Sequence, residues 1–468
     1  MTAFVKLALL GCVVFITGDA VNAACFRQRC RSPLALRVSL AYGLGTGTLA
    51  LLGFYASLAG LPVTPAAIVL LALPFAVLLL CLRIKAPARG SLRKRPEKRT
   101  GMTAPAALLC LLLLAGVTLV TLRALSTPMH MPDAVAQWGL KAKIIFHERT
   151  VRASDFSDPR RLIYHARYPF LVPLLESYAY AFLGEADDRQ AKLLFPGFFI
   201  ALLLYLYAAQ RAFAPPVRAL LFTALLTMMP VFIGDGHGSP SSGYADLPLA
   251  FYYAVACISL FTWLSDRDRN GLLLAAVFMT FAAFTKKEGL LLDAIALAAA
   301  CLAGLVRGSG RPGDVLRGCL LCAAVVLIAL LPWFFFQNSI CLPPWEAEFT
   351  AASLSPSRLS SQLGRLPLIG QSIMEVIFTP RHHNLLWILF LCAALLWIKK
   401  TVSHPRLFFV IVIVCNTAAL CASALAFPFA WWTGIIHDFY RLTMVNIPLA
   451  VYFISYQLQD TAGRRAAE

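Results

Sequence analysis

Charged residues are scarce in this 468-residue chain: they make up 14% of it, and only 23 residues are acidic. Water-soluble domains usually carry about a quarter charged residues, so this deficit excludes a soluble protein. Apolar residues reach 59% and the mean hydropathy is +0.73, which excludes a disordered chain. They form long blocks rather than short alternating segments, which excludes a transmembrane β-barrel. The sequence therefore predicts an all-α polytopic membrane protein.

Two further kinds of pattern are missing from the chain. Nearly all of the 13 cysteines lie inside apolar runs, where cysteine behaves as a small hydrophobic residue, so we predict no disulfide framework. Cys319 and Cys322 have CxxC spacing, but the surrounding GCLLCAAVVL is typical of a lipid-facing helix, and we predict no metal site there. The chain also lacks a GKS/T nucleotide fingerprint and an internal repeat.

Long apolar blocks dominate what the chain does contain. A helix needs about 20 apolar residues to cross the bilayer, and about thirteen stretches come close to that length. They lie near residues 3–20, 35–58, 62–82, 103–122, 190–209, 216–233, 246–265, 271–284, 290–306, 315–335, 385–399, 406–426 and 442–457.

The 41 lysines and arginines, which give a net charge of +18, orient these helices. Such an excess would indicate nucleic acid in a soluble protein, but in a membrane protein it marks cytoplasmic loops, so no nucleic acid partner is expected. The segment 83–99 carries eight of the basic residues and should be cytoplasmic. Because successive membrane helices cross in alternating directions, the other basic turns are then also cytoplasmic. Two long polar loops, 123–189 and 337–384, are outside.

The apolar segment at the start of the chain could be a signal peptide or a membrane helix. Residues 1–25 resemble a signal peptide, but cleavage would turn the basic segment 83–99 outward, so we predict an uncleaved helix. That basic segment separates a three-helix membrane unit, 1–100, from a body, 101–468.

The apolar stretch 168–183 contains two prolines, and counting it as a membrane span would reverse the orientation of every later helix. We predict that it lies in the membrane interface with its Tyr and Phe side chains toward the headgroups.

The first group of unexpected polar residues follows the fourth predicted helix. Asp133, Gln137 and Lys141 are spaced by four and would share one face of a helix, with Trp138 beside them. A carboxylate held near cations stays ionised and can accept a proton. The plain alternative is a helix N-cap at Asp133 followed by a solvated basic face.

Four more polar clusters lie at helix ends that the topology places outside. Ionisable groups are costly near the bilayer, so each is a candidate site, and lysine or arginine there can bind a lipid phosphate. The alternatives are anchors that reach the headgroups, flexible turns and helix caps. The clusters are His165 to Pro169, the Gly-rich loop 234–245 running into Asp246, Thr285 to Gly289, and His437 to Arg441.

The order of these clusters resembles the GT-C glycosyltransferases, in particular the bacterial branch similar to protein O-mannosyltransferases and aminoarabinose transferases (glycosyltransferase 39 type), over about residues 103–457. The resemblance implies a GT-C type body with loop helices on the outer face, a polyprenyl-phosphate-linked sugar donor and an inverting transfer. Asp133 would be the general base and Asp246 a second catalytic acidic residue. The implied substrate-binding residues are Trp138, Lys141, His165, Tyr168, Tyr244, Lys287, Glu288 and Arg441.

The chain departs from that family at two points. Asp133 has no acidic neighbour, and Lys286-Lys287-Glu288 replaces the more usual Lys-Asn-Glu or Lys-Gly-Pro. No cofactor is expected, although a divalent cation at Asp133 and Asp246 is left open because some relatives use one.

The predicted function is transfer of a sugar to a glycan, lipid or protein acceptor at the outer face of the inner (plasma) membrane. Membrane lipid is the remaining expected partner. The competing interpretations are a transporter or lipid-carrier flippase, and a polymerase or ligase of surface polysaccharide. Transporters usually place their ionisable groups near the midplane, whereas these clusters lie at predicted outer helix ends.

Overall fold

A computed structural model describes residues 2–26, 33–84, 103–158, 160–161, 163–306, 312–342, 355–402, 405–427 and 432–459 of the chain. The structure is all-helical: 81% of it is helix, and the described residues contain no strand. The predicted fold class is confirmed to that extent. The basic segment 83–100, on which the predicted division into two units depends, lies almost wholly outside the described residues.

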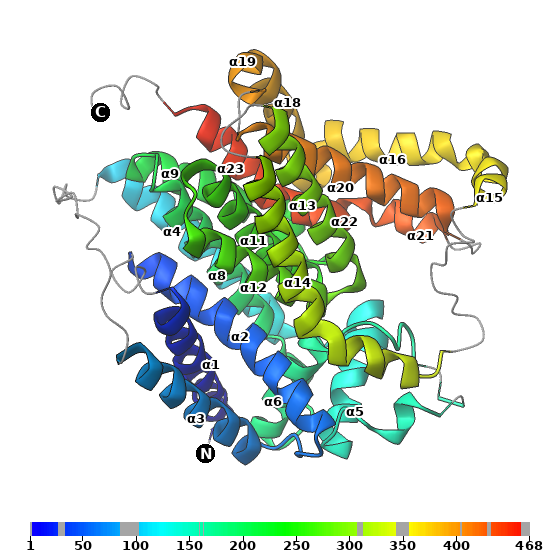
Figure 1. The fold of residues 1–468 in the computed structure, drawn as a ribbon. Coiled ribbons are helices and arrows are strands. Elements are labelled where there is room, and N and C mark those ends of the chain that lie inside the picture. The colour runs from blue at the N-terminus through cyan, green and yellow to red at the C-terminus, as the bar shows by residue number, and fades with distance from the viewer. Residues whose placement is uncertain are drawn as a thin grey trace.

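Figure 1 shows the helices coloured in chain order. The first group comprises α1 (Ala3–Cys25), α2 (Leu34–Leu58), α3 (Pro65–Ile84), α4 (Ala104–Ser126), α5 (Leu140–Glu148), α6 (Leu171–Leu183) and α7 (Asp188–Ala191). The second comprises α8 (Leu194–Gln210), α9 (Pro216–Ala224), α10 (Pro230–Ile233), α11 (Asp246–Asp266), α12 (Arg269–Thr285), α13 (Lys287–Val306) and α14 (Pro312–Phe336). The third comprises α15 (Pro356–Ser361), α16 (Leu366–Phe378), α17 (Pro380–His383), α18 (Leu386–Leu396), α19 (Ile398–Thr401), α20 (Leu407–Ala426), α21 (Trp432–His437), α22 (Phe439–Leu442) and α23 (Ile447–Gln457).

Six shorter helical turns complete the described chain. One is π-helical, η2 (Ala134–Gly139), and the others are 3₁₀ turns: η3 (Ser154–Phe156), η4 (Leu225–Met228), η5 (Gln337–Ser339), η7 (Leu363–Arg365) and η8 (Thr443–Asn446).

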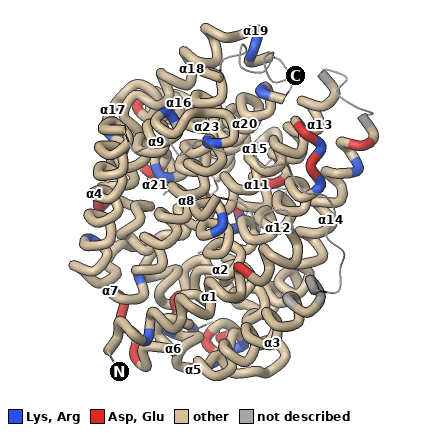
Figure 2. Tube along the Cα trace, turned by 90° about the vertical axis from the view of Figure 1, so that its left-hand side faces the viewer, with Lys and Arg blue, Asp and Glu red and all other residues tan. Residues whose placement is uncertain are grey.

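Within the described residues, eight helices are long and apolar enough to cross a membrane: Ala3–Cys25, Leu34–Leu58, Ala104–Ser126, Asp188–Gln210, Asp246–Asp266, Lys287–Leu305, Gly313–Ser339 and Leu407–Ala426. Each coincides with a predicted span. Five further apolar helices have 10–17 residues, and α6 is one of them. The eight long helices support a membrane-embedded protein, but the predicted total of thirteen spans is not confirmed. Figure 2 shows the accompanying charge pattern, in which most of the chain carries neither sign.

Helix α11 lies at the centre of the fold and positions the site. Nearly all its side chains from Asp246 to Leu264 are buried, and it packs against α8, α12 and α13. Its aromatic residues Phe251 and Tyr252 contact Phe278 of α12. Because lipid and protein interior are equally apolar, close packing and internal hydrogen bonds hold such helices together. Consistent with this, Thr46 of α2 hydrogen-bonds to Tyr252 at 2.8 Å.

The prediction for residues 168–183 is wrong for two of its tyrosine side chains, which do not point toward headgroups. Helix α6 packs against α1, α2 and α5. Tyr178 and Tyr180 are buried, and their hydroxyls donate to the Leu49 carbonyl at 3.2 Å and to Asp188 at 2.7 Å. Since both hydroxyls find partners inside the protein, these tyrosines do not need the headgroup region.

Glycines let α1 and α2 pack closely, and this yields a stability prediction. A Cβ on Gly45 of α2 would overlap the backbone carbonyl of Val14 in α1. We expect Gly45→Val to lower the free energy of unfolding by roughly 1–3 kcal/mol, because the helices must separate to admit the side chain. Thermal unfolding in detergent measures this. Gly11→Val is the matched control, since a Cβ there meets nothing within 4 Å; equal effects of the two substitutions would contradict the proposed packing.

Candidate functional site

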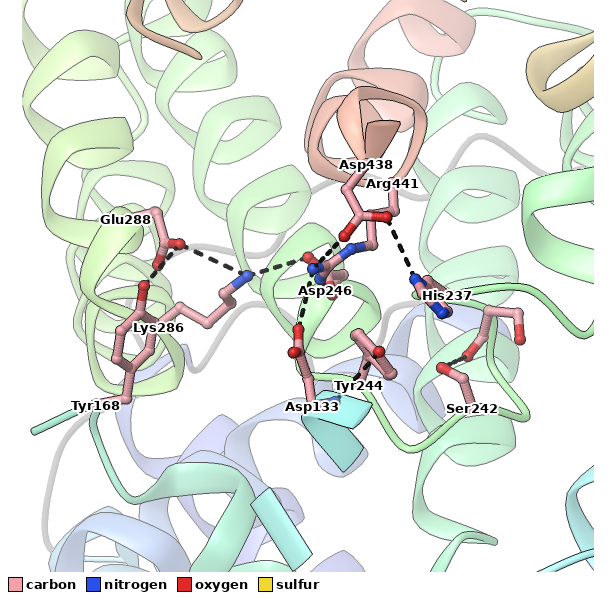
Figure 3. Close-up of polar contacts among 11 residues, drawn as sticks. Asp133, Tyr168, His237, Ser242, Tyr244, Asp246, Lys286, Glu288, Asp438 and Arg441 are labelled. Carbon is pink, nitrogen blue, oxygen red and sulfur yellow. Dashed lines mark hydrogen bonds and ion pairs between the residues drawn. The ribbon is translucent and has the colours of Figure 1, made fainter. Parts of the chain in front are cut away.

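Arg441, in the short helix α22, holds three carboxylates together (Figure 3). Its Nη1 donates to Asp246 at 3.0 Å, and its Nη2 donates to Asp133 at 3.0 Å and lies 2.8 Å from Asp438. The arginine side chain is only 10% exposed, and that of Asp246 is 5% exposed. Hydrogen-bonded ion pairs gain strength when water is excluded, so this cluster fixes three chain segments relative to one another.

Lys286 extends the cluster from the other side of Asp246. Its Nζ donates to Asp246 Oδ1 at 3.1 Å and lies 3.7 Å from Glu288 Oε1. Glu288 Oε1 also accepts a hydrogen bond of 3.1 Å from the hydroxyl of Tyr168. A continuous chain of contacts therefore runs from Asp133 through Arg441, Asp246, Lys286 and Glu288 to Tyr168 (Figure 3).

Tyr244 and His237 close the opposite end of the cluster. The guanidinium of Arg441 lies 4.8 Å from the ring centroid of Tyr244, whose hydroxyl accepts from the backbone N–H of Asp133 at 3.3 Å. The His237 ring stacks on Tyr244, and its Nδ1 is 3.3 Å from Asp438 Oδ1. The hydrogen bond to Asp438 raises the pKa of His237. Burial alone would raise the pKa of Asp438, but His237 and Arg441 hold that pKa below its usual value.

Local sequence explains how these side chains reach one point. Asp246 begins α11, and Lys286 is the extended residue between α12 and α13. In the loop before α11, Gly238 and Gly243 adopt positive φ angles of 80° and 85°, which favour glycine. A Cβ on Gly238 would lie 3.0 Å from the Cβ of Arg441. The Gly-rich loop thus allows close approach to the arginine.

Tyr168 organises the remaining predicted residues. Its ring packs edge-on against Trp138 with centroids 5.9 Å apart, and the ring of His165 lies 4.9 Å away. The ammonium groups of Lys141 and Lys287 lie 5.9 Å and 5.7 Å from the Tyr168 centroid, within cation–π range. Lys141 is fully buried and donates to the carbonyl of His165.

All ten predicted site residues belong to this one constellation: Asp133, Trp138, Lys141, His165, Tyr168, Tyr244, Asp246, Lys287, Glu288 and Arg441. Their chemical roles stay predictions. The helix ends that the topology assigned to one side do meet. The predicted site omitted Lys286, Asp438 and His237, each of which adjoined a predicted residue or lay in a polar cluster.

Two detailed expectations about Asp133 do not hold. The shared face with Lys141 is interrupted by the π-helical turn η2, whose wider turn breaks the spacing of four. Asp133 therefore pairs with Arg441, and Lys141 lies among aromatic rings. The alternative of an N-cap is not supported either, because the Asp133 side chain makes no capping hydrogen bond.

Two buried polar atoms of this site are open to a ligand. Arg441 Nε and Glu288 Oε2 are buried without a hydrogen-bond partner among the described residues. Buried polar atoms usually have partners, so these two are points at which a polar ligand can bind. Within the same residues, no group of three or more His, Cys, Asp or Glu side chains is arranged to hold a metal ion.

No protein-family model, curated protein or solved structure matches this chain.

Proposed function

We propose that this protein is a membrane glycosyltransferase that moves a sugar from a polyprenyl phosphate to a glycan, lipid or protein acceptor at the outer face of the plasma membrane. One observation carries the proposal: the polar clusters of an otherwise apolar chain converge on a single site around Arg441 and Tyr168. Ionisable groups are energetically costly in a membrane protein, so their convergence indicates a reaction or a bound ligand.

The site contains groups suited to both ends of such a transfer. The bond between the anomeric carbon and the phosphate oxygen breaks, and its electron pair leaves with the phosphate, so a cation must face the leaving group while a carboxylate faces the sugar. Lys287, whose ammonium lies 5.7 Å from the centroid of the Tyr168 ring, is the proposed phosphate contact. Asp246 stays buried between two cations, where it holds Arg441 and Lys286 in place.

Asp133 is the residue whose loss tests the proposed function. We expect Asp133→Asn to lower sugar transfer at least a hundredfold, because the variant loses the carboxylate that faces Arg441 and that the resemblance assigns to proton transfer. Purified protein in proteoliposomes, supplied with lipid-phosphate sugars and candidate acceptors, measures the rate. Mass spectrometry of surface glycans and lipids, with and without the gene, identifies the sugar and the acceptor.

The matched control is Asp155→Asn in the same predicted outer loop, where Asp155 pairs with Arg161 at 3.3 Å. It should transfer sugar like the wild type. Unchanged transfer by Asp133→Asn would remove Asp133 from the reaction, and the absence of any lipid-linked sugar donor would overturn the proposed function. A long glycan product would identify the polymerase or ligase variant of the same chemistry.

One observation favours a second candidate, an ion-coupled transporter. Asp293 of α13 is 3% exposed, and both its carboxyl oxygens have no hydrogen-bond partner among the described residues. It lies six residues beyond Lys287, roughly 9 Å further along the helix axis. A buried acid at that depth can carry an ion or proton. Uptake of a labelled solute into proteoliposomes without any lipid-linked sugar, abolished by Asp293→Asn, would support this candidate instead.

A further inference from the structure

His237 and Asp438 form a carboxylate–imidazole pair at the edge of the site. The 3.3 Å contact joins His237 Nδ1 to Asp438 Oδ1, and the other oxygen of Asp438 lies 2.8 Å from Arg441 Nη2. Asp438 is thus fixed from two sides. A carboxylate at Nδ1 favours the tautomer in which Nδ1–H donates and Nε2 keeps its lone pair, so the second nitrogen can act as a base.

His237 is more exposed than the three aspartates that contact Arg441. The His237 side chain is 37% exposed, compared with 24% for Asp133 and 5% for Asp246. One face of the ring is held against Tyr244, with the two planes only 15° apart. The imidazole is therefore oriented and still open to solvent, as a group that meets an incoming acceptor must be.

The position of His237 relative to the cations also suits a group that meets the acceptor. Figure 3 shows His237 at one end of the chain of contacts, and Lys286, Glu288 and Tyr168 at the other, with Arg441 between them. In a single displacement, the leaving phosphate and the acceptor approach the anomeric carbon from opposite sides. Lys287 beside Tyr168 marks the phosphate side, so the acceptor side coincides with His237.

We infer that His237 is the general base of the transfer and that Asp438 is its positioning residue; this inference rests on the proposed function. As the acceptor oxygen or nitrogen bonds to the anomeric carbon, its proton moves to Nε2, and the electron pair of the broken carbon–oxygen bond leaves with the phosphate. Asp133, with one carboxylate oxygen on Arg441, then contributes by holding that arginine. Loss of Asp133 lowers transfer under either assignment, and the pH dependence distinguishes them.

The charged groups around His237 determine that pH dependence. Asp438 and Asp133 raise its pKa, Arg441 lowers it, and Tyr244 and Tyr440 pack nearby. The net shift is upward, so the protonated, inactive form persists to a higher pH than for an ordinary histidine. Transfer should rise with pH through the pKa of His237. Removal of Asp438 lowers that pKa and should move the rise to lower pH.

The test is the pH profile of kcat/KM for sugar transfer by the full-length protein in proteoliposomes. The acid limb of this profile is the rise in kcat/KM with pH as His237 loses its proton. We expect His237→Gln to lose the acid limb and to lower the rate at pH 8 by about 10²–10⁴-fold, with partial recovery on addition of imidazole. Asp438→Asn should shift the limb to lower pH and lower the plateau. His147→Gln, at an exposed histidine near the end of α5, is the matched control and should keep the wild-type profile.

Thermal unfolding of each variant in detergent separates a catalytic effect from misfolding. If His237→Gln unfolds early, Asp438→Asn carries the test, because a shifted limb cannot arise from partial loss of active protein. An acid limb that persists unshifted in both variants overturns the role of His237 while leaving the proposed function intact. Wild-type protein that transfers no sugar overturns both.

Discussion

Arg441→Gln is expected to abolish sugar transfer and to lower the free energy of unfolding by roughly 3–5 kcal/mol, the usual cost of removing one partner from a buried ion pair. The variant leaves Asp133, Asp246 and Asp438 close together without their shared guanidinium. Carboxylates that are buried near one another cannot all remain ionised at low cost. The transfer assay and thermal unfolding in detergent measure the two effects.

A lysine should not replace this arginine. Arg441 uses two nitrogens of one planar group to reach its three partners, whereas an ammonium offers a single nitrogen on a flexible stem. We therefore expect Arg441→Lys to retain little activity. Arg160→Gln is the control, because that side chain is 88% exposed and pairs with its near neighbour Asp158. Wild-type stability and activity in Arg441→Lys would show that the arginine is not the centre of the site.

Adjacent lysines should respond very differently to the same substitution. Lys286→Gln leaves Asp246 with one cation instead of two at a buried position, and we expect it to lower the free energy of unfolding by about 3 kcal/mol. Lys287→Gln is the matched neighbour: its side chain is half-buried and rests on the Tyr168 ring, so its effect on stability should be about 1 kcal/mol or less. Lys287→Gln should weaken donor binding more than it lowers stability.

A double-mutant cycle of Lys286→Gln with Asp246→Asn isolates the pair. Removal of both charges should cost less than the sum of the two single substitutions, because neither ion is left buried alone. Thermal unfolding supplies all four values. Strict additivity, or equal losses at positions 286 and 287, would contradict the contact between Lys286 and Asp246.

The residues of the candidate site could be selected from the sequence because charge is rare in this chain. Against an apolar background, Asp133, Asp246 and Arg441 stand out at the ends of hydrophobic blocks, and a topology based on basic loops assigns them to one side. The structure brings them within hydrogen-bond distance. Two tyrosines of the short apolar helix α6 were predicted to face headgroups but are buried, because the composition of this helix suits a buried protein helix as well as an interfacial one.

The sequence alone determined the class of protein, the approximate position of most long helices and the segments that carry the polar groups, because hydropathy and charge act residue by residue along the chain. Only the tertiary structure decided which groups pair. Lys286, and not Lys287, meets Asp246 because the extended break between α12 and α13 directs consecutive side chains to different neighbours. Arg441 became the centre because α11, α22 and the segment before η2 meet there, and such meetings depend on helix rotation and packing across hundreds of residues.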